Sequence, residues 1–149
     1  MKTKIVLSAL LFVLTLTNAF SQDLKLPKRS KVAAVDTMAN KATSMYTESK
    51  SINDELDAIK ITITDVETTE AELKKLGLLG KRIKRQGENL VSLAGLKAPA
   101  TKAIGSAKMM KKVKATLAMK RTIAIEVHLV KEIKAQGEKL AEKMKALKG

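Results

Sequence analysis

The sequence predicts an all-α protein: a short N-terminal helix followed by a long antiparallel helical hairpin, packed as a coiled-coil-like three-helix bundle. Apolar residues recur at steps of three and four over most of the chain, which is the spacing of one helix face. After residue 21 the only aromatic residue is Tyr46, so the core must consist of Leu, Ile, Val, Ala and Met. Such side chains favour interdigitating helices over a β-sandwich, which prefers aromatic and β-branched residues.

The first 21 residues have the order of a secretory signal peptide. Lys2 and Lys4 precede an apolar run at residues 5–16, and Ala19 and Ser21 supply the small residues of a cleavage site. We place cleavage after Ser21, with cleavage after Ala19 as the second choice. The other interpretation is a membrane anchor, but the run is shorter than the roughly 20 residues that a spanning helix needs. We therefore expect export, to the periplasm or the cell exterior.

The rest of the chain divides into a lead-in and one helical domain. Residues 22–30 contain Pro27 and show no periodicity, which predicts a flexible segment. Residues 31–149 have the length of a single domain, with helices expected at about 31–50, 52–94 and 102–147. Capping patterns leave open whether the helices break near Ser51 and near Thr68.

The strongest helix-breaking cluster surrounds Pro99, between Gly95 and Gly105, and predicts the turn of the hairpin there. Beyond this turn the apolar spacing puts one stripe on the third helix, which we expect to pack inside the bundle. The stripe consists of Met109 or Met110, Val113, Leu117, Ile123, Val127, Val130, Ile133, Gly137, Leu140, Met144 and Leu147.

Residues 83–90 and 133–140 share a pattern displaced by 50 residues, which indicates an internal repeat. A hairpin that turns near Pro99 would put the two copies at opposite ends. We expect their glycines, Gly87 and Gly137, to let a neighbouring helix approach closely.

Charge is segregated along the chain. Residues 73–122 hold fourteen basic residues and one acid, Glu88, whereas residues 36–72 hold nine acids and three basic residues. In a hairpin that turns near Pro99, the basic block forms the turn end and the acidic block lies at the open end. A rod polarised in this way orients toward anionic surfaces.

The basic block is the candidate binding site. We expect it to contact an anionic surface or polymer: lipid headgroups, lipopolysaccharide, or acidic or unfolded protein. Nucleic acid is a weaker candidate, because single-strand binders stack bases on aromatic side chains and this chain offers none in the block. The candidate residues are Lys74, Lys75, Lys81, Arg82, Lys84, Arg85, Lys108, Lys111, Lys112 and Lys114.

Two other functions remain open. One is a structural envelope component that self-associates through its apolar stripe, and the other is an amphipathic protein that lies on a membrane surface through Met109, Met110, Val113, Leu117 and Ile123. Enzyme function is not expected. The chain has no Cys and a single histidine, His128, so no catalytic, cofactor or zinc pattern emerges.

Overall fold

The computed structural model describes residues 24–61 and 66–148, without the side chains of residues 66 and 67. These residues form helices α2 (Ala33–Ala58), α3 (Val66–Gly95), α4 (Lys97–Ser106) and α5 (Met109–Lys148), and no strand occurs among them. The all-α prediction is therefore confirmed. The predicted signal peptide, residues 1–21, lies outside the described residues.

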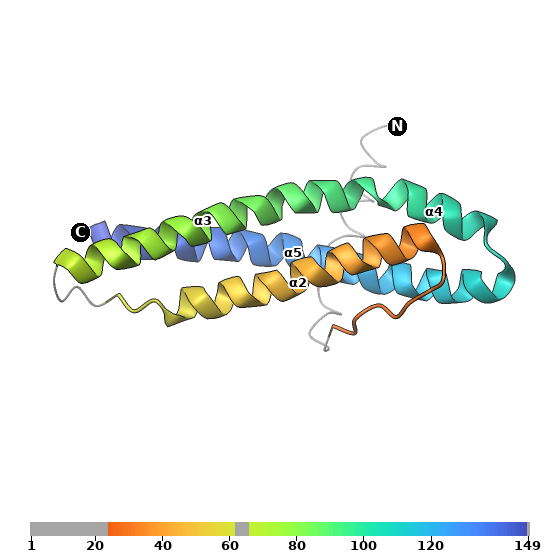
Figure 1. Cartoon of the computed structure of the whole chain (residues 1–149), viewed down its shortest axis with the longest axis horizontal. Helices are drawn as coiled ribbons and strands as arrows, with labels where there is room; N and C mark the ends of the chain where they lie inside the picture. The colour runs from red at the N-terminus through yellow and green to blue at the C-terminus, as the bar shows by residue number, and fades with distance from the viewer. Residues whose placement is uncertain (1–23, 62–65, 149) are drawn as a thin grey trace, which may run out of the picture.

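The helices lie along a single elongated rod (Figure 1). α2 and α5 run in one direction, while α3 runs in the other and α4 continues it to the end of the rod. The apolar core has two parts along this rod. One contains Met38, Leu93 and Ile125, and the other contains Ile52 and Leu76. α2 thus contributes to both parts and joins α3 to α5 along its length.

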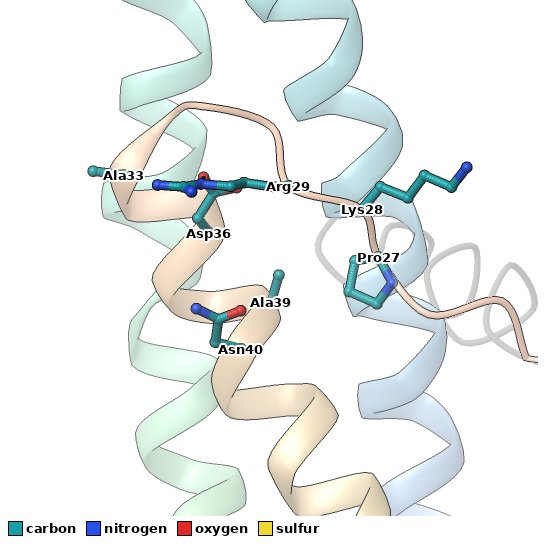
Figure 2. A pocket seen from close by; sticks show the side chains of 7 residues that line it. All are labelled: Pro27, Lys28, Arg29, Ala33, Asp36, Ala39 and Asn40. Atoms are coloured by element: carbon teal, nitrogen blue, oxygen red, sulfur yellow. Dashed lines mark ion pairs between the residues drawn. The ribbon is translucent and has the colours of Figure 1, made fainter.

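The segment before α2 is tied to the bundle through Asp36 (Figure 2). The Asp36 carboxylate accepts hydrogen bonds from the Ser30 N–H and hydroxyl, each at 2.7 Å, and from the Lys31 N–H at 3.1 Å. Burial alone would raise the pKa of Asp36, but these hydrogen bonds and Arg29 lower it overall below its ordinary value. Ser30 is fully buried, so the end of the predicted lead-in has a defined position.

α2 continues without a break through Ser51, so the predicted boundary near residues 50–52 is wrong. Ser49 and Ile52 are both buried, which means that core packing extends across the capping pattern. The Ser51 hydroxyl donates to the Glu55 side chain at 2.9 Å instead of capping a helix end. Tertiary packing therefore overrides the local signal.

The expected helix over residues 52–94 is instead divided between α2 and α3. α2 ends at Ala58, and Ile59 takes an extended backbone with φ −73° and ψ 108°. α3 begins at Val66, two residues before the break that the capping pattern near Thr68 left open. Ile59 and Ile61 are β-branched and have lower helix propensity than unbranched residues, which favours the end of α2 here.

Pro99 interrupts the helix but does not reverse the chain. Proline has no N–H to give to the carbonyl four residues earlier, which here belongs to Gly95, and its ring clashes with that carbonyl. α3 accordingly ends at Gly95, and α4 resumes with Pro99 in its first turn, where the missing N–H costs little. The predicted turn near Pro99 is therefore wrong, because Figure 1 shows α4 continuing in the direction of α3.

The chain reverses at Ala107 and Lys108, between α4 and α5. Ala107 has an extended backbone, with φ −75° and ψ 148°, and its N–H donates to the Ile104 carbonyl at 3.2 Å. The Ser106 hydroxyl donates to the Ala103 carbonyl at 3.2 Å, which satisfies part of the helix end. The turn thus lies about eight residues beyond the predicted position.

This shift brings the two copies of the internal pattern together at α2. The Gln86 side-chain amide donates to the Met45 carbonyl at 3.1 Å, and the Gln136 amide donates to the Ser49 carbonyl at 2.9 Å. Both glutamines are almost completely buried. The expectation that the copies lie at opposite ends is therefore wrong, because it depended on a turn near Pro99.

The glycines of the repeat do not mediate close packing. A Cβ added at Gly87 or Gly137 would meet no atom within 4 Å outside the helix's own backbone. The close approach occurs at Gly80, where an added Cβ would lie 3.2 Å from the Leu140 side chain. The packing role predicted for Gly87 and Gly137 is therefore wrong.

The buried face of α5 differs from the prediction over its first half. The buried residues are Ala115, Ala118, Met119, Thr122, Ile125, Glu126 and Leu129. The predicted stripe lies on the opposite side, where Met109, Met110, Val113, Leu117, Ile123, Val127 and Val130 are exposed. Ala115 and Ala118 instead belong to the core cluster that contains Val35 and Met38 of α2 and Ala100 of α4. Only toward the C-terminus does the predicted stripe enter the core, with Leu147 buried and Ile133, Leu140 and Met144 partly buried.

None of the helices in the described part of the chain is both long and apolar enough to span a membrane.

Candidate functional site

The ten predicted binding residues fall into two groups that the fold keeps apart. Six lie on α3, from Lys74 to Arg85, and four lie at the turn between α4 and α5, from Lys108 to Lys114. Because α5 runs back beside α4, the nearest members along the rod are Arg85 and Lys114, whose axial separation is roughly 20 Å at 1.5 Å per residue. They therefore do not form one basic pole.

Arg82 is a structural residue that joins α3 to α2. Its Nε lies 2.7 Å from a Glu48 oxygen and its Nη1 lies 2.6 Å from a Glu55 oxygen, while Nη2 donates to the Ser51 hydroxyl at 3.1 Å. The two carboxylates raise the pKa of the guanidinium further above its ordinary value. The hydrogen bond from Arg82 is the main cause that lowers the pKa of Glu55. With its donors engaged in this way, Arg82 has little capacity left for a partner.

The other basic side chains of the α3 group are exposed but share their surface with acids. Lys75 pairs with Glu72 at 2.7 Å. A groove of about 510 Å³ between the end of α2 and α3 is lined by basic residues and also by Glu55 and Glu72. The antiparallel course of α2 and α3 brings the acidic half of α2 beside Lys74–Arg85. Lys74, Lys81, Lys84 and Arg85 thus lie in a field of mixed charge.

The second group forms a different surface at the end of the rod. We call it the tip surface, and define it as Lys108, Met109, Met110, Lys111, Lys112, Val113, Lys114 and Leu117. Every residue from Lys108 to Lys114 is exposed. α2 begins short of this end, so α4 is the helix beside the first turns of α5 (Figure 1). Within the described residues, none of the four lysines forms an ion pair.

The tip surface combines cations with exposed apolar side chains. Met109 and Met110 are each 77% exposed, Val113 is 64% exposed and Leu117 is 51% exposed. Successive residues of an α-helix are turned by about 100°, so Lys112 and Lys114 lie on either side of Val113. The result is an apolar strip bordered by lysines.

Acids are absent from a long stretch of sequence around this surface. Residues 89–125 contain eight basic residues and no Asp or Glu. Lys97 finds its partner beyond this stretch, in Glu126, whose Oε1 lies 2.9 Å from the Lys97 Nζ. The tip surface is therefore a part of the predicted basic block with no acid in the surrounding sequence.

Two other features carry no chemistry of their own. His128 packs its ring against Tyr46, with centroids 5.6 Å apart, and lies 3.9 Å from Glu132. The pocket of about 320 Å³ beside the start of α2 in Figure 2 has Asp36 as its one acid, and Ser30 and Lys31 already hold that carboxylate. Within residues 24–61 and 66–148, no three acidic or histidine side chains gather closely enough to hold a metal ion.

Comparison with protein-family models, with curated proteins and with solved structures gave no match for this chain. From the sequence, the four lysines were part of one larger basic block and the apolar residues beside them were expected in the core, whereas both are exposed at the start of α5. The sequence signal that distinguishes the buried face of α5 from the exposed strip is the set of small residues Ala115, Ala118 and Thr122, which lie on one face of the helix.

Proposed function

We propose that this protein is a non-enzymatic binding protein that contacts anionic surfaces or polymers through the tip surface. The observation that carries the proposal is the acid-free, exposed cluster of Lys108, Lys111, Lys112 and Lys114 at one end of the rod. Long-range attraction would orient the rod with this end toward a negative surface.

The position of these lysines argues for a role in binding rather than in folding. They lie at the N-terminus of α5, where the helix macrodipole is positive and anions are favoured. The first turn of α5 contains no acid that would compensate. Lys111 and Lys114 also lie three residues apart on one helix face, where like charges repel. An anionic partner would relieve both unfavourable terms.

Export is part of the proposal and rests on residues 1–21, whose order of charge, apolar run and small residues is typical of a signal peptide. A protein recovered from the periplasm or medium would then begin at Gln22. A protein that keeps Met1 and stays with the cytoplasmic fraction would contradict export.

Retention on immobilised heparin, measured as the salt concentration needed for elution, tests the binding proposal. The test variant carries Lys108→Gln, Lys111→Gln, Lys112→Gln and Lys114→Gln. The matched control replaces four exposed lysines farther along α5: Lys131→Gln, Lys134→Gln, Lys145→Gln and Lys148→Gln. Both variants have the same net charge, so a difference between them reports position.

We expect the tip variant to elute at much lower salt than the control, because each lysine removed from the binding surface reduces the number of counterions that binding releases. Equal elution of the two variants would overturn the tip surface as the binding site. A variant with Lys74→Gln, Lys81→Gln, Lys84→Gln and Arg85→Gln tests the α3 group in the same assay. We expect this variant to behave like the control.

A second candidate function is self-association within the cell envelope. It is favoured by the outer face of α5, where Ile123, Val127 and Val130 are 37%, 39% and 52% exposed. Sedimentation of the Val127→Gln, Val130→Gln variant tests it. A shift of the parent protein's oligomer to monomer would support this function, whereas a monomeric parent protein would exclude it.

A further inference from the structure

We propose that the partner of the tip surface is an anionic lipid bilayer, and that the first turns of α5 insert their apolar side chains among the headgroups. This inference rests on the proposed function, because it names the class of anion that the tip surface binds. Charge attraction brings the rod to the membrane, and Met109, Met110, Val113 and Leu117 then leave water.

The apolar side chains have the placement that such insertion requires. Val113 and Leu117 are one helical turn apart, and Met109 precedes Val113 by the same interval, so the three form a strip along the helix. Met110 lies at the edge of this strip. All four are at least half exposed, and the core of the bundle uses the opposite face of α5. The strip is therefore available without any unfolding.

The lysines have the placement that an anionic headgroup layer requires. Lys112 and Lys114 border the strip on its two sides, Lys108 precedes the first turn of α5, and Lys111 lies on the opposite face of that turn. A lysine stem can lie along apolar surface while its ammonium group remains at the level of the phosphates. Helices that lie in the membrane interface combine an apolar face with basic residues in this way.

Two other occupants fit the surface less well. A second copy of the chain packed tip surface to tip surface would bring the same lysines against one another, because residues 89–125 contain no acid to pair with them. Single-stranded nucleic acid would leave the apolar strip unused, because bases stack on aromatic side chains and the strip contains none. A bilayer interface satisfies the cations and the apolar side chains together.

A single fluorescent label tests the insertion, because the chain contains no cysteine and one introduced thiol is unique. An environment-sensitive dye is attached at Met109→Cys in one protein and at Val91→Cys in the control. Val91 is 75% exposed and apolar but lies on α3, away from the tip surface. Vesicles of phosphatidylcholine, with or without roughly one-third phosphatidylglycerol, provide the anionic and neutral surfaces.

We expect the dye at position 109 to shift to the blue with the anionic vesicles alone, and the dye at position 91 to remain unchanged. The Met110→Gln, Val113→Gln variant should lower the vesicle partition coefficient by roughly tenfold or more. Its retention on heparin should stay at the parent value, because its lysines are intact. Replacing the four lysines should lower partitioning several-hundred-fold, at roughly fivefold for each lysine.

The outcomes separate the two proposals. Retention on heparin without a dye shift on anionic vesicles would overturn membrane insertion and leave the polyanion-binding function in place. A dye shift produced by a denatured acidic protein, and by no vesicle, would overturn the lipid assignment in favour of a protein partner. A lysine variant that binds heparin and vesicles as well as the parent protein does would overturn both proposals.

Discussion

The lysines of the tip surface should weaken the fold that carries them. Lys108 with Lys111, Lys108 with Lys112, and Lys111 with Lys114 are spaced three or four residues apart, and each such like-charge pair costs about 0.2–0.5 kcal/mol. Cations in the first turn of α5 add an unfavourable interaction with the helix macrodipole, of about 0.3 kcal/mol or more at low salt. Because these side chains are exposed and adjust to one another, we expect the four-glutamine variant to be more stable by about 1 kcal/mol overall.

Urea denaturation followed by far-UV circular dichroism measures this gain. The control is the four-glutamine variant at Lys131, Lys134, Lys145 and Lys148, where Lys134 pairs with Glu138 and two of the lysines occupy the favourable C-terminal turn of α5. The control should be unchanged or slightly less stable. The gain of the tip variant should shrink in moderate salt, since salt screens exposed charges. A tip variant that is less stable than the parent protein would refute this reasoning.

Three further predictions concern the bundle itself. Arg82→Gln should lower the free energy of unfolding by about 1–2 kcal/mol, because the guanidinium joins α3 to two carboxylates and a hydroxyl on α2. The control Lys84→Gln should change it by less than about 0.5 kcal/mol. Equal urea midpoints for the two variants would contradict the structural role of Arg82. Gly87→Ala and Gly137→Ala should each stabilise the protein by roughly 0.8–1 kcal/mol, because alanine has the higher helix propensity and the space beside each glycine is open. A loss of stability in urea would show that a neighbouring side chain packs there. The lowered pKa of Asp36 contributes stability that is present above about pH 4 and is lost as the pH falls through that lowered pKa. In an acid titration followed by circular dichroism, Asp36→Asn should therefore lose stability less steeply below about pH 4 than the parent protein. Parallel acid profiles would contradict this prediction.

The all-α class could be predicted because apolar steps of three and four run through most of the chain. Ile52 and Leu56 are four residues apart, Leu76 and Ile83 are seven apart, and all four are buried. The direction of the chain at Pro99 could not be predicted in the same way. A proline removes one hydrogen bond wherever it sits, and whether the helix then bends or reverses depends on the packing of the residues that follow.

The candidate site was harder to predict because hydrophobicity alone selects the wrong face of α5. Met110, Val113 and Leu117 are more apolar than Ala115 and Ala118, yet the alanines face the bundle. Small residues let neighbouring helices approach closely, so their contribution to stability comes from close packing and not from buried apolar area. The division of the basic block into two groups also depends on topology. The antiparallel course of α2 and α3 places Glu48 and Glu55 beside Arg82.

Binding of anions at the α4–α5 end of the rod, and not along α3, is the central claim. The most direct test is a nuclear magnetic resonance titration of the isotope-labelled protein with anionic lipid nanodiscs, in which each backbone amide reports its own surroundings. We predict shifts or broadening for residues 108–117, with residues 74–85 unchanged apart from the overall loss of signal caused by the larger complex. Selective changes at residues 74–85, with residues 108–117 unaffected, would contradict the claim and return the binding site to α3.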